Sequence, residues 1–394
     1  MPRMMPEQRS QRHPPAGPAS RVYSGAMASE GGNDRDDRES PDLPPAARPA
    51  TDAPKLRRIE ITNYKAIDHL VLDVPAPTMP GDPDIFVVGS KNGVGKTSLL
   101  ECCALARLVT RHEHSFRHTV EIQRTDEQIA QLIRTGAPMA RVQVSQTLDE
   151  DLAFQLTRTP EHFAIEGRRY APPDPQQGER YISMMLDGTQ FPGLADELFG
   201  ISPNCLIHPE LLYFHSFRKV AEGPLPMHQM LREKANEDSR PVSALKLKIL
   251  RTLMARAGLF EDVDNRKADL LIERLNRILR VFTGGRVDRL RVASEQIDIR
   301  ITNSQGLSFS FDGLSSGQKE SVSTLFLIED ATRDLPALVL IDEPELHLNA
   351  EWQCELIHQL HTLAPQNQYI LATHSEDIFA SVPEDRRVLL GPQG

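Results

Sequence analysis

Two adjacent carboxylates and a lysine-threonine pair are the residues of this chain best suited to chemistry. Asp342 and Glu343 follow five apolar residues, 337–341, which predict a strand buried on both faces of a sheet. Adjacent carboxylates at the end of a buried strand are costly unless a cation or a reaction uses them. Lys96 and Thr97 close the glycine-rich stretch SKNGVGKT. We therefore expect phosphate and divalent-cation chemistry at these positions.

The glycine-rich stretch predicts a phosphate-binding loop between the strand 84–88 and a helix. Its backbone N–H groups and the helix dipole would face a phosphate chain. Lys96 would neutralise the β and γ phosphates, and the Thr97 hydroxyl would ligate Mg²⁺. The usual pattern has glycine where Ser90 stands, and we expect Gly89 to supply the flexibility. The nucleotide-binding residues predicted here are Ser90, Asn92, Gly93, Val94, Gly95, Lys96, Thr97 and Ser98.

The two carboxylates would complete a site for ATP and Mg²⁺. We expect Asp342 to hold the Mg²⁺, directly or through a water, as a Walker B aspartate does. Glu343 would accept a proton from the attacking water or orient it. A solvated acidic turn before Pro344 is the alternative. The presence of a phosphate loop elsewhere in the chain favours the catalytic interpretation.

A family resemblance rests on the stretch LSSGQ, residues 314–318, just before a predicted helix at 318–331. It resembles the signature motif of ABC-type ATPases, in the variant of RecF-like, SMC-like and OLD-like proteins. The resemblance implies that this motif reaches the nucleotide of an opposing subunit, in a head-to-tail homodimer or higher oligomer. A plain helix N-cap is the alternative. The signature residues are Ser315, Ser316, Gly317 and Gln318.

Two further segments extend the resemblance. The strand predicted at 368–372 ends near His374, which resembles the switch histidine that senses the γ-phosphate; with Glu343 and Lys96 it makes the predicted catalytic set. The stretch IEITNYKAI is similar to the first strand and turn of RecF-like heads, so Asn63 and Lys65 are expected near the base or ribose. The stretch ELHL is similar to the OLD-like and Septu-type subgroup.

The sequence also departs from the family pattern. Asn349 and Ala350 replace the His-Pro often found after this motif, which leaves the structure of the inter-subunit loop open. No glutamine stands in a clean Q-loop context. The stretch 212–218 occupies about the expected position, so Arg218 or a neighbour is a candidate for coupling the lobes.

The element order predicts an α/β P-loop NTPase of ABC-ATPase type. We expect a mixed or parallel sheet with flanking helices, an N-terminal antiparallel β part and a helical insertion. Within the middle of the chain we predict one strand at 206–217, helices across 244–282 broken near Gly258, and a strand pair at 290–301 and 307–311. The predicted divisions are a disordered tail at 1–54, head parts at 55–110 and 286–394, and an insertion at 111–285.

Composition limits the surroundings of the protein. The chain has 394 residues, four cysteines without a CxxC pair, and no apolar stretch near the ~20 residues that span a bilayer. We expect a cytoplasmic protein with core thiols and no membrane partner. The net charge of −10 argues against a general nucleic-acid coat but not against a local basic groove. Candidate phosphate contacts, or equally a solvated rim, are Arg57, Arg58, Arg168, Arg169, Arg289 and Arg291.

The function that these features predict is ATP hydrolysis at a dimer interface, with closure and opening of the dimer regulating a partner. An anti-phage or DNA-related setting follows from the resemblance, and a nuclease is one candidate effector, because this chain shows no nuclease constellation of its own. The alternatives are an ATP-binding clamp with little hydrolysis and a RecF-like DNA repair or chromosome ATPase. The histidines of 111–118 are close together in the sequence and could form a metal site. A solvated polar face of a helix explains them better.

Overall fold

The fold is seen in a computed structural model. It describes residues 54–79, 81–90, 95–109, 131–147, 151–158, 163–170, 181–186, 205–208, 210–216, 225–226, 244–257, 265–293 and 296–391. The predicted tail, 1–54, falls almost wholly outside these ranges. The described residues form a mixed α/β fold with a largely parallel central sheet and an N-terminal antiparallel sheet, so the predicted fold class is confirmed.

The central sheet has the strand order β16-β3-β15-β14-β9-β8. Its neighbours are parallel except for the antiparallel pair β8 and β9. The inner strands are runs of apolar residues without alternation, as expected where both faces of a sheet are covered. The bounds are β3 (Asp84–Ser90), β8 (Cys205–His208), β9 (Leu211–Phe214), β14 (Leu338–Asp342), β15 (Gln368–Thr373) and β16 (Arg387–Leu390).

Two predicted strands are wrong in the same way. The single strand expected at 206–217 is the hairpin of β8 and β9, whose turn includes Glu210 at a φ of 74°. The single strand expected at 290–301 is part of the hairpin of β11 (Gly285–Ala293) and β12 (Gln296–Asn303). Apolar residues continue on both sides of each turn, so hydrophobic pattern alone does not reveal that the chain reverses.

The N-terminal antiparallel sheet has the strand order β2-β1-β4-β5-β6-β7. Ile59 and Ile61 alternate with exposed or half-buried neighbours and lie fully in the core, as a sheet with one covered face requires. The bounds are β1 (Leu56–Tyr64), β2 (Ile67–Asp73), β4 (Met139–Gln146), β5 (Asp151–Arg158), β6 (Phe163–Tyr170) and β7 (Tyr181–Leu186).

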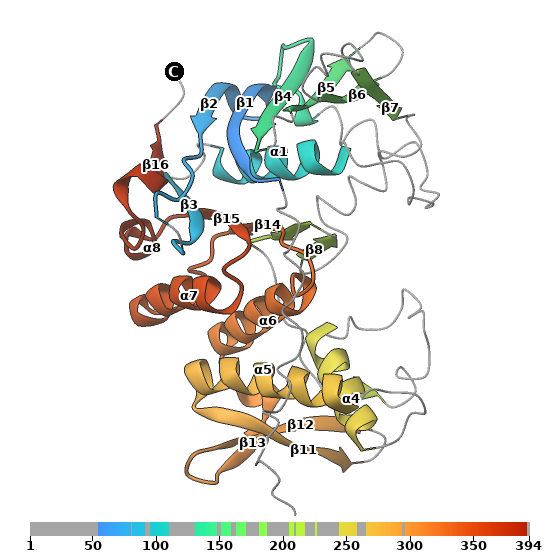
Figure 1. Ribbon diagram of the computed structural model, residues 1–394, viewed down its shortest axis with the longest axis vertical. Helices are drawn as coiled ribbons and strands as arrows, with labels where there is room; N and C mark the ends of the chain where they lie inside the picture. Colours follow the sequence, from blue (N-terminus) through green and yellow to red (C-terminus); the bar gives the residue numbers. More distant parts are fainter. Residues whose placement is uncertain are drawn as a thin grey trace, which may run out of the picture. The chain divides into compact units, whose positions relative to one another are not determined.

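Helix α1 (Lys96–Val109) lies between the two sheets (Figure 1). One apolar core joins it to β1, β4 and β5 on one side and to β14 and β15 on the other. Cys102 and Cys103 are buried in this core, and burial raises the pKa of the Cys103 thiol to about 12. The expectation of core thiols agrees with these two residues but is wrong for Cys354, which is exposed on α7.

A second core covers the other face of the central sheet. Along β14, Leu338 and Leu340 join the α1 core, whereas Val339 and Ile341 join the second one. Helices α6 and α7 lie on that face in Figure 1. The remaining bounds are α4 (Ala244–Arg256), α5 (Asn265–Thr283), α6 (Ser316–Ala331), α7 (Ala350–Leu363), α8 (Glu376–Ala380), β10 (Leu225–Pro226) and β13 (Ser308–Ser310).

A third, small sheet packs against α5 and has the order β10-β12-β11, with β13 also paired to β12. The two helices predicted across 244–282 are confirmed as α4 and α5, and residues 258–264 between them lie outside the described ranges. None of the helices in the described part of the chain is both long and apolar enough to cross a membrane.

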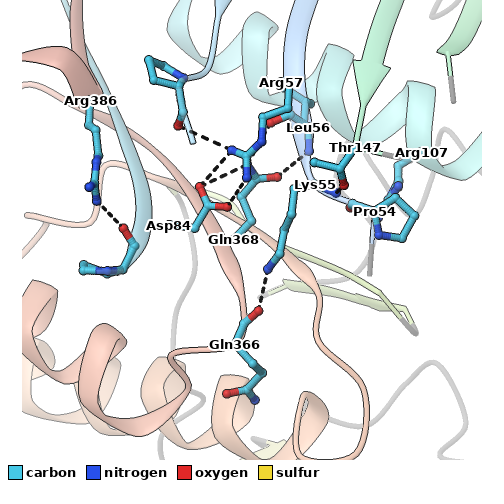
Figure 2. Close-up of polar contacts among 12 residues, drawn as sticks. Pro54, Lys55, Leu56, Arg57, Asp84, Arg107, Thr147, Gln366, Gln368 and Arg386 are labelled. Atoms are coloured by element: carbon cyan, nitrogen blue, oxygen red, sulfur yellow. Dashed lines mark hydrogen bonds and ion pairs between the residues drawn. The ribbon is translucent and has the colours of Figure 1, made fainter. Parts of the chain in front are cut away.

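Polar side chains join the antiparallel sheet to the amino ends of the central strands (Figure 2). Gln368 accepts from the Leu56 N–H at 2.7 Å and donates to the Leu56 carbonyl at 2.9 Å. Arg57 makes two hydrogen bonds to Asp84, at 2.8 and 3.2 Å. Because these contacts are buried or half-buried, they fix β1 against β3 and β15 at the edge opposite the predicted site.

Candidate active site

The carboxyl ends of three parallel strands bring the predicted residues together. In the register of the central sheet, Asp342 of β14 pairs with Ala372 of β15, and Thr373 pairs with Gly89 of β3. Ser90 and His374 therefore follow at the same edge. Open α/β sheets bind ligands at this edge, where the loops after the strands meet.

Thr97 and Asp342 are in direct contact, although 245 positions separate them in the sequence. The Thr97 hydroxyl, in the first turn of α1, donates to Asp342 Oδ2 at 2.7 Å. Asp342 is 1% exposed, so its carboxylate is held at a fixed position at the end of β14. A hydroxyl and a carboxylate oxygen are hard donors of the kind that Mg²⁺ takes in nucleotide sites, so these residues fit the predicted cation.

Lys96 lies against Ser90 and His374. Its Nζ is 3.0 Å from Ser90 Oγ, 3.3 Å from the Ser90 carbonyl oxygen and 2.8 Å from His374 Nε2. Burial lowers the pKa of Lys96, and the nearby carboxylates, Asp342 first among them, oppose that shift. A buried ammonium surrounded by neutral groups and acidic neighbours is well prepared to receive an anionic phosphate.

Glu343 faces His374 from the end of β14. Its Oε1 is 3.7 Å from His374 Nε2, and both side chains are 32% exposed. Glu343 has a φ of 48°, a left-handed conformation that a non-glycine residue rarely takes and that often marks a functional position. Its backbone N–H donates to the Ala372 carbonyl at 2.8 Å, which ties this turn to β15.

The phosphate loop is only partly described. Asn92, Gly93 and Val94 lie outside the described residues. Gly95 has a φ of 98°, and a Cβ there would stand 2.9 Å from Ile67 Cγ1, so glycine is required on two grounds. The expected flexibility of Gly89 is wrong: it is a strand residue, and a Cβ there would meet Phe379 Cδ2 at 2.8 Å. Glycine is therefore needed at position 89 because Phe379 packs closely against it, not because the backbone must be flexible.

The signature residues form the start of α6. Ser315 accepts from the Gln318 N–H at 3.2 Å, and Gln318 accepts from the Ser315 N–H at 3.0 Å, a capping box. A Cβ on Gly317 would stand 2.2 Å from the carbonyl oxygen of His347. Ser315 therefore acts as the N-cap of α6, which is the alternative that the sequence analysis gave for this motif. Ser315 and Ser316 are exposed, which leaves their binding to a second subunit a prediction.

The segment expected near the base has a different set of contacts. Asn63 and Lys65 have φ values of 54° and 47°. Lys65 Nζ pairs with Glu101 of α1 at 2.6 Å, and the Tyr64 hydroxyl donates to the same carboxylate at 3.3 Å. Burial raises the pKa of Glu101, and Lys65 opposes that shift. The structure thus ties the turn to the helix that carries Lys96, a link that the sequence did not indicate.

Glu345 also lies at this edge, and its role was not predicted from the sequence. Its carboxylate accepts from the Thr373 hydroxyl at 2.7 Å and from the His374 N–H at 2.6 Å. Its only signal in the sequence was a second glutamate two positions after Glu343.

Other predicted residues lie apart from this edge or cannot be placed. The histidines of 111–118 and Arg218 fall outside the described residues, as do the side chains of Arg168 and Arg169. Arg289 is exposed and pairs with Asp288 at 2.8 Å. Across the described ranges, no group of three or more His, Cys, Asp or Glu side chains is placed to hold a metal ion.

Comparison with known proteins agrees with the chemistry of this edge. Residues 224–380 match the family described as "AAA domain, putative AbiEii toxin, Type IV TA system", a range that includes Ser315, Asp342 and His374 but not the phosphate loop. The chain is 31% identical over 112 residues to the "Septu protein PtuA" of Bacillus thuringiensis, which covers 25% of this chain and 28% of that protein.

The chain is also similar to a retron ATPase and to an Smc head. A "Retron Vc95 probable ATPase" of Vibrio cholerae serotype O1 biovar El Tor is 29% identical over 114 residues, 25% of this chain and 21% of that protein. A crystal structure of an Smc head bound to the C-winged helix domain of ScpA aligns with a TM-score of 0.44 at 15% identity, covering 84% of this chain and 93% of that chain.

The chain spans less than a third of the length of the curated relatives it matches. Within that limit, the sequence motifs, the matched domain and the named relatives agree. Residues 224–380 are similar to an AAA-type ATPase domain, and about a quarter of the chain is similar to Septu and retron ATPases, which agrees with the ABC-type ATPase resemblance drawn from its motifs.

Proposed function

We propose that this chain binds ATP with Mg²⁺ at the carboxyl edge of its central sheet and hydrolyses it. The observation that carries the proposal is the pair of contacts Thr97 to Asp342, at 2.7 Å, and Lys96 to His374, at 2.8 Å. These contacts join the phosphate-loop helix to the ends of β14 and β15, as a nucleotide held between loop and carboxylates requires.

The proposed roles follow from where each side chain lies. Thr97 and Asp342 would hold Mg²⁺, which when bound would supply positive charge that stabilises the negative charge of the phosphates. Lys96 would exchange its contacts with Ser90 for phosphate oxygens. Glu343 is exposed enough to meet a water and would accept its proton as the water attacks the γ-phosphate. His374 would donate a hydrogen bond to that phosphate.

The signature motif supports a site shared between two copies of the chain. Ser315 and Ser316 are exposed at the N-terminus of the 16-residue helix α6, where N–H groups and the helix dipole favour an anion. We propose that they complete the nucleotide site of an opposing subunit in an ATP-linked homodimer. We also retain the division into head parts 55–110 and 286–394, with 111–285 inserted between them.

The setting of this activity is proposed from the relatives. One is named as a Septu protein and another as a retron ATPase, so we propose that ATP-driven closure and opening of the dimer regulates an effector protein in anti-phage defence. A DNA-related role is the second setting, and the exposed Arg289 is a candidate contact for nucleic acid.

The test of hydrolysis compares Glu343→Gln with native protein. The variant keeps the size and hydrogen-bonding reach of the side chain but removes the base, so phosphate release should fall about 100-fold or more while ATP binding is kept. Glu351→Gln, at an exposed position in the first turn of α7, is the matched control and should behave as native protein. A Glu343→Gln variant that hydrolyses ATP at the native rate would refute the assignment of the base.

The native rate separates hydrolysis from the alternative of a clamp. Native protein that binds ATP but releases no phosphate above background, with and without the effector, would favour an ATP-held structural clamp.

The shared site has a separate test. Mixing Lys96→Ala protomers with Ser315→Arg protomers leaves one composite site without either change. Hydrolysis should recover in the mixture to about a quarter of the native rate, since half of the dimers would be mixed and each would have one intact site. A mixture no more active than either variant alone would contradict a site completed by Ser315.

A further inference from the structure

We propose that Glu345 is the residue that positions the switch histidine, His374, against the γ-phosphate. This inference rests on the proposed function, because it gives Glu345 a role in the same reaction without contact with the nucleotide. Glu345 lies in the loop 343–348 that follows the Walker B strand, and it acts through the backbone of β15.

The carboxylate of Glu345 holds the end of β15 at two points. Oε1 accepts from the His374 N–H at 2.6 Å, and Oε2 accepts from the Thr373 hydroxyl at 2.7 Å. Both oxygens of the side chain thus take part in hydrogen bonds to neighbouring residues of the same segment. Hydrogen bonds to a carboxylate are stronger than those to a neutral acceptor.

The residues around Glu345 make this contact a rigid one. Thr373 is 0% exposed, and its hydroxyl also accepts from the Ser375 N–H at 2.9 Å. Ser375 in turn caps α8 and donates to Gln353 of α7 at 2.5 Å. A connected set of hydrogen bonds thus runs from the Walker B loop through the histidine segment to two helices.

The placement of the imidazole depends on this set. His374 Nε2 lies 2.8 Å from Lys96 Nζ and 3.7 Å from Glu343 Oε1, so its ring stands between the phosphate-binding lysine and the proposed base. The ring is one-third exposed and hangs from a backbone whose N–H is held by Glu345. Loss of that bond would free the ring from both neighbours without removing any group that touches ATP.

The loop that carries Glu345 also contacts the signature helix. Its other end includes His347, at a φ of 62°, whose carbonyl oxygen fills the space beside Gly317. The Leu348 N–H donates to the Glu345 carbonyl at 2.9 Å, so the two ends are joined by a single turn. Glu345 therefore lies where the histidine segment and the start of α6 meet the same loop.

The kinetic test is a double-mutant cycle between Glu345 and His374. Glu345→Ala should lower kcat about 10-fold or more with the Kd for ATP changed less than about 2-fold, since the histidine is proposed to act on the transferring phosphate. In a His374→Ala background the same change should add less than about 2-fold, because its effect passes through the missing ring. Glu351→Gln is the matched control. Independent, additive losses in the cycle would overturn the proposal.

The conservative variant separates positioning from general stability. In Glu345→Gln one oxygen can still accept from the His374 N–H, and the amide can donate to Thr373 Oγ, so kcat should return to within about 3-fold of native. A Glu345→Gln variant as impaired as Glu345→Ala, with unchanged thermal stability, would mean that the charge itself acts in the reaction and would refute a positioning role.

Hydrogen exchange gives a measurement that does not need hydrolysis. Amides of the segment 372–376 should exchange about 10-fold faster or more in Glu345→Ala than in native protein, because the His374 N–H loses its acceptor. Faster exchange in Glu345→Ala, found together with a native protein that hydrolyses no ATP, would keep the positioning contact and refute the ATPase. Unchanged exchange in Glu345→Ala, with an active native protein, would refute the contact alone.

Discussion

At the amino edge of the central sheet, buried amides complete the hydrogen bonds of the backbone, whereas at the carboxyl edge ionisable groups lie close together and some of them are partly exposed. Asn367, fully buried, accepts from the Ala337 N–H at 2.9 Å and donates to Thr332 Oγ1 at 2.9 Å. Gln368 does the same for both backbone groups of Leu56. Each of these side chains serves the fold and leaves little capacity for a ligand.

The carboxyl edge has the opposite character. Lys96 is buried with a lowered pKa, Asp342 is a carboxylate with 1% exposure, and Glu343 and His347 have left-handed backbone conformations. Such features cost stability and persist where the reaction uses them. The same sheet is thus stabilised by buried amides at one end, and at the other end it carries the residues proposed to bind the phosphates.

The largest expected effect would come from Asp342→Asn. The amide oxygen can still accept from Thr97, so the fold should hold, but the charge proposed to hold Mg²⁺ is gone. We expect phosphate release to fall about 1,000-fold, or ~4 kcal/mol in the barrier. Steady-state hydrolysis and thermal unfolding in the same buffer check this. A variant that loses stability in proportion to activity would place Asp342 with the structural edge.

Gln368→Met should have the reverse profile. The side chain keeps its length but leaves the buried N–H and carbonyl of Leu56 without their partner, which should lower the free energy of unfolding by about 2–4 kcal/mol. Hydrolysis per folded molecule should stay within about 2-fold of native, since the edge is remote from the site. Denaturant unfolding measures the first quantity. If fully folded Gln368→Met protein lost activity, the amino edge would also contribute to the reaction, which would contradict the difference between the two edges.

Two neighbouring arginines at the amino edge form one largely buried and one exposed ion pair. Arg57 bonds twice to Asp84, which is 8% exposed, so Arg57→Met should cost about 2–3 kcal/mol of stability. Arg58 pairs with Asp73 at 2.7 Å in solvent, with side chains 48% and 70% exposed, so Arg58→Met should cost less than about 1 kcal/mol. Equal losses in denaturant unfolding would show that burial is not what distinguishes the two pairs.

The smallest effect concerns the pH dependence of Lys96. Burial sets its folded pKa below the unfolded value, so the unfolded state binds more protons between the two values and stability rises with pH there. Below the folded pKa the lysine is charged in both states, so the full cost of burying its charge lowers the stability of the folded protein. Lys96→Met should therefore unfold at a slightly higher temperature than native protein at pH 7, without nucleotide. The difference should shrink as pH approaches the ordinary lysine pKa, and a difference that grows with pH would contradict the buried-cation account.

Local sequence pattern located the strands that precede the acidic motif and the histidine, because each is a short run of apolar residues. The strand before Asp342 and the end of β15 were found with errors of a residue. Hairpins were missed where apolar residues stand on both sides of a short turn, as at Glu210. Glu345 was missed because its partners, Thr373 and His374, are close only in space.

The sequence alone indicated phosphate and cation chemistry, from a lysine and a threonine after a glycine-rich loop, two carboxylates after a buried strand, and a histidine after another. Only the tertiary structure decided that Thr97 meets Asp342 and that Lys96 meets His374, because the register of parallel strands is set by packing between distant segments. It also decided which carboxylate holds the histidine, since that depends on where the Walker B loop turns back onto β15.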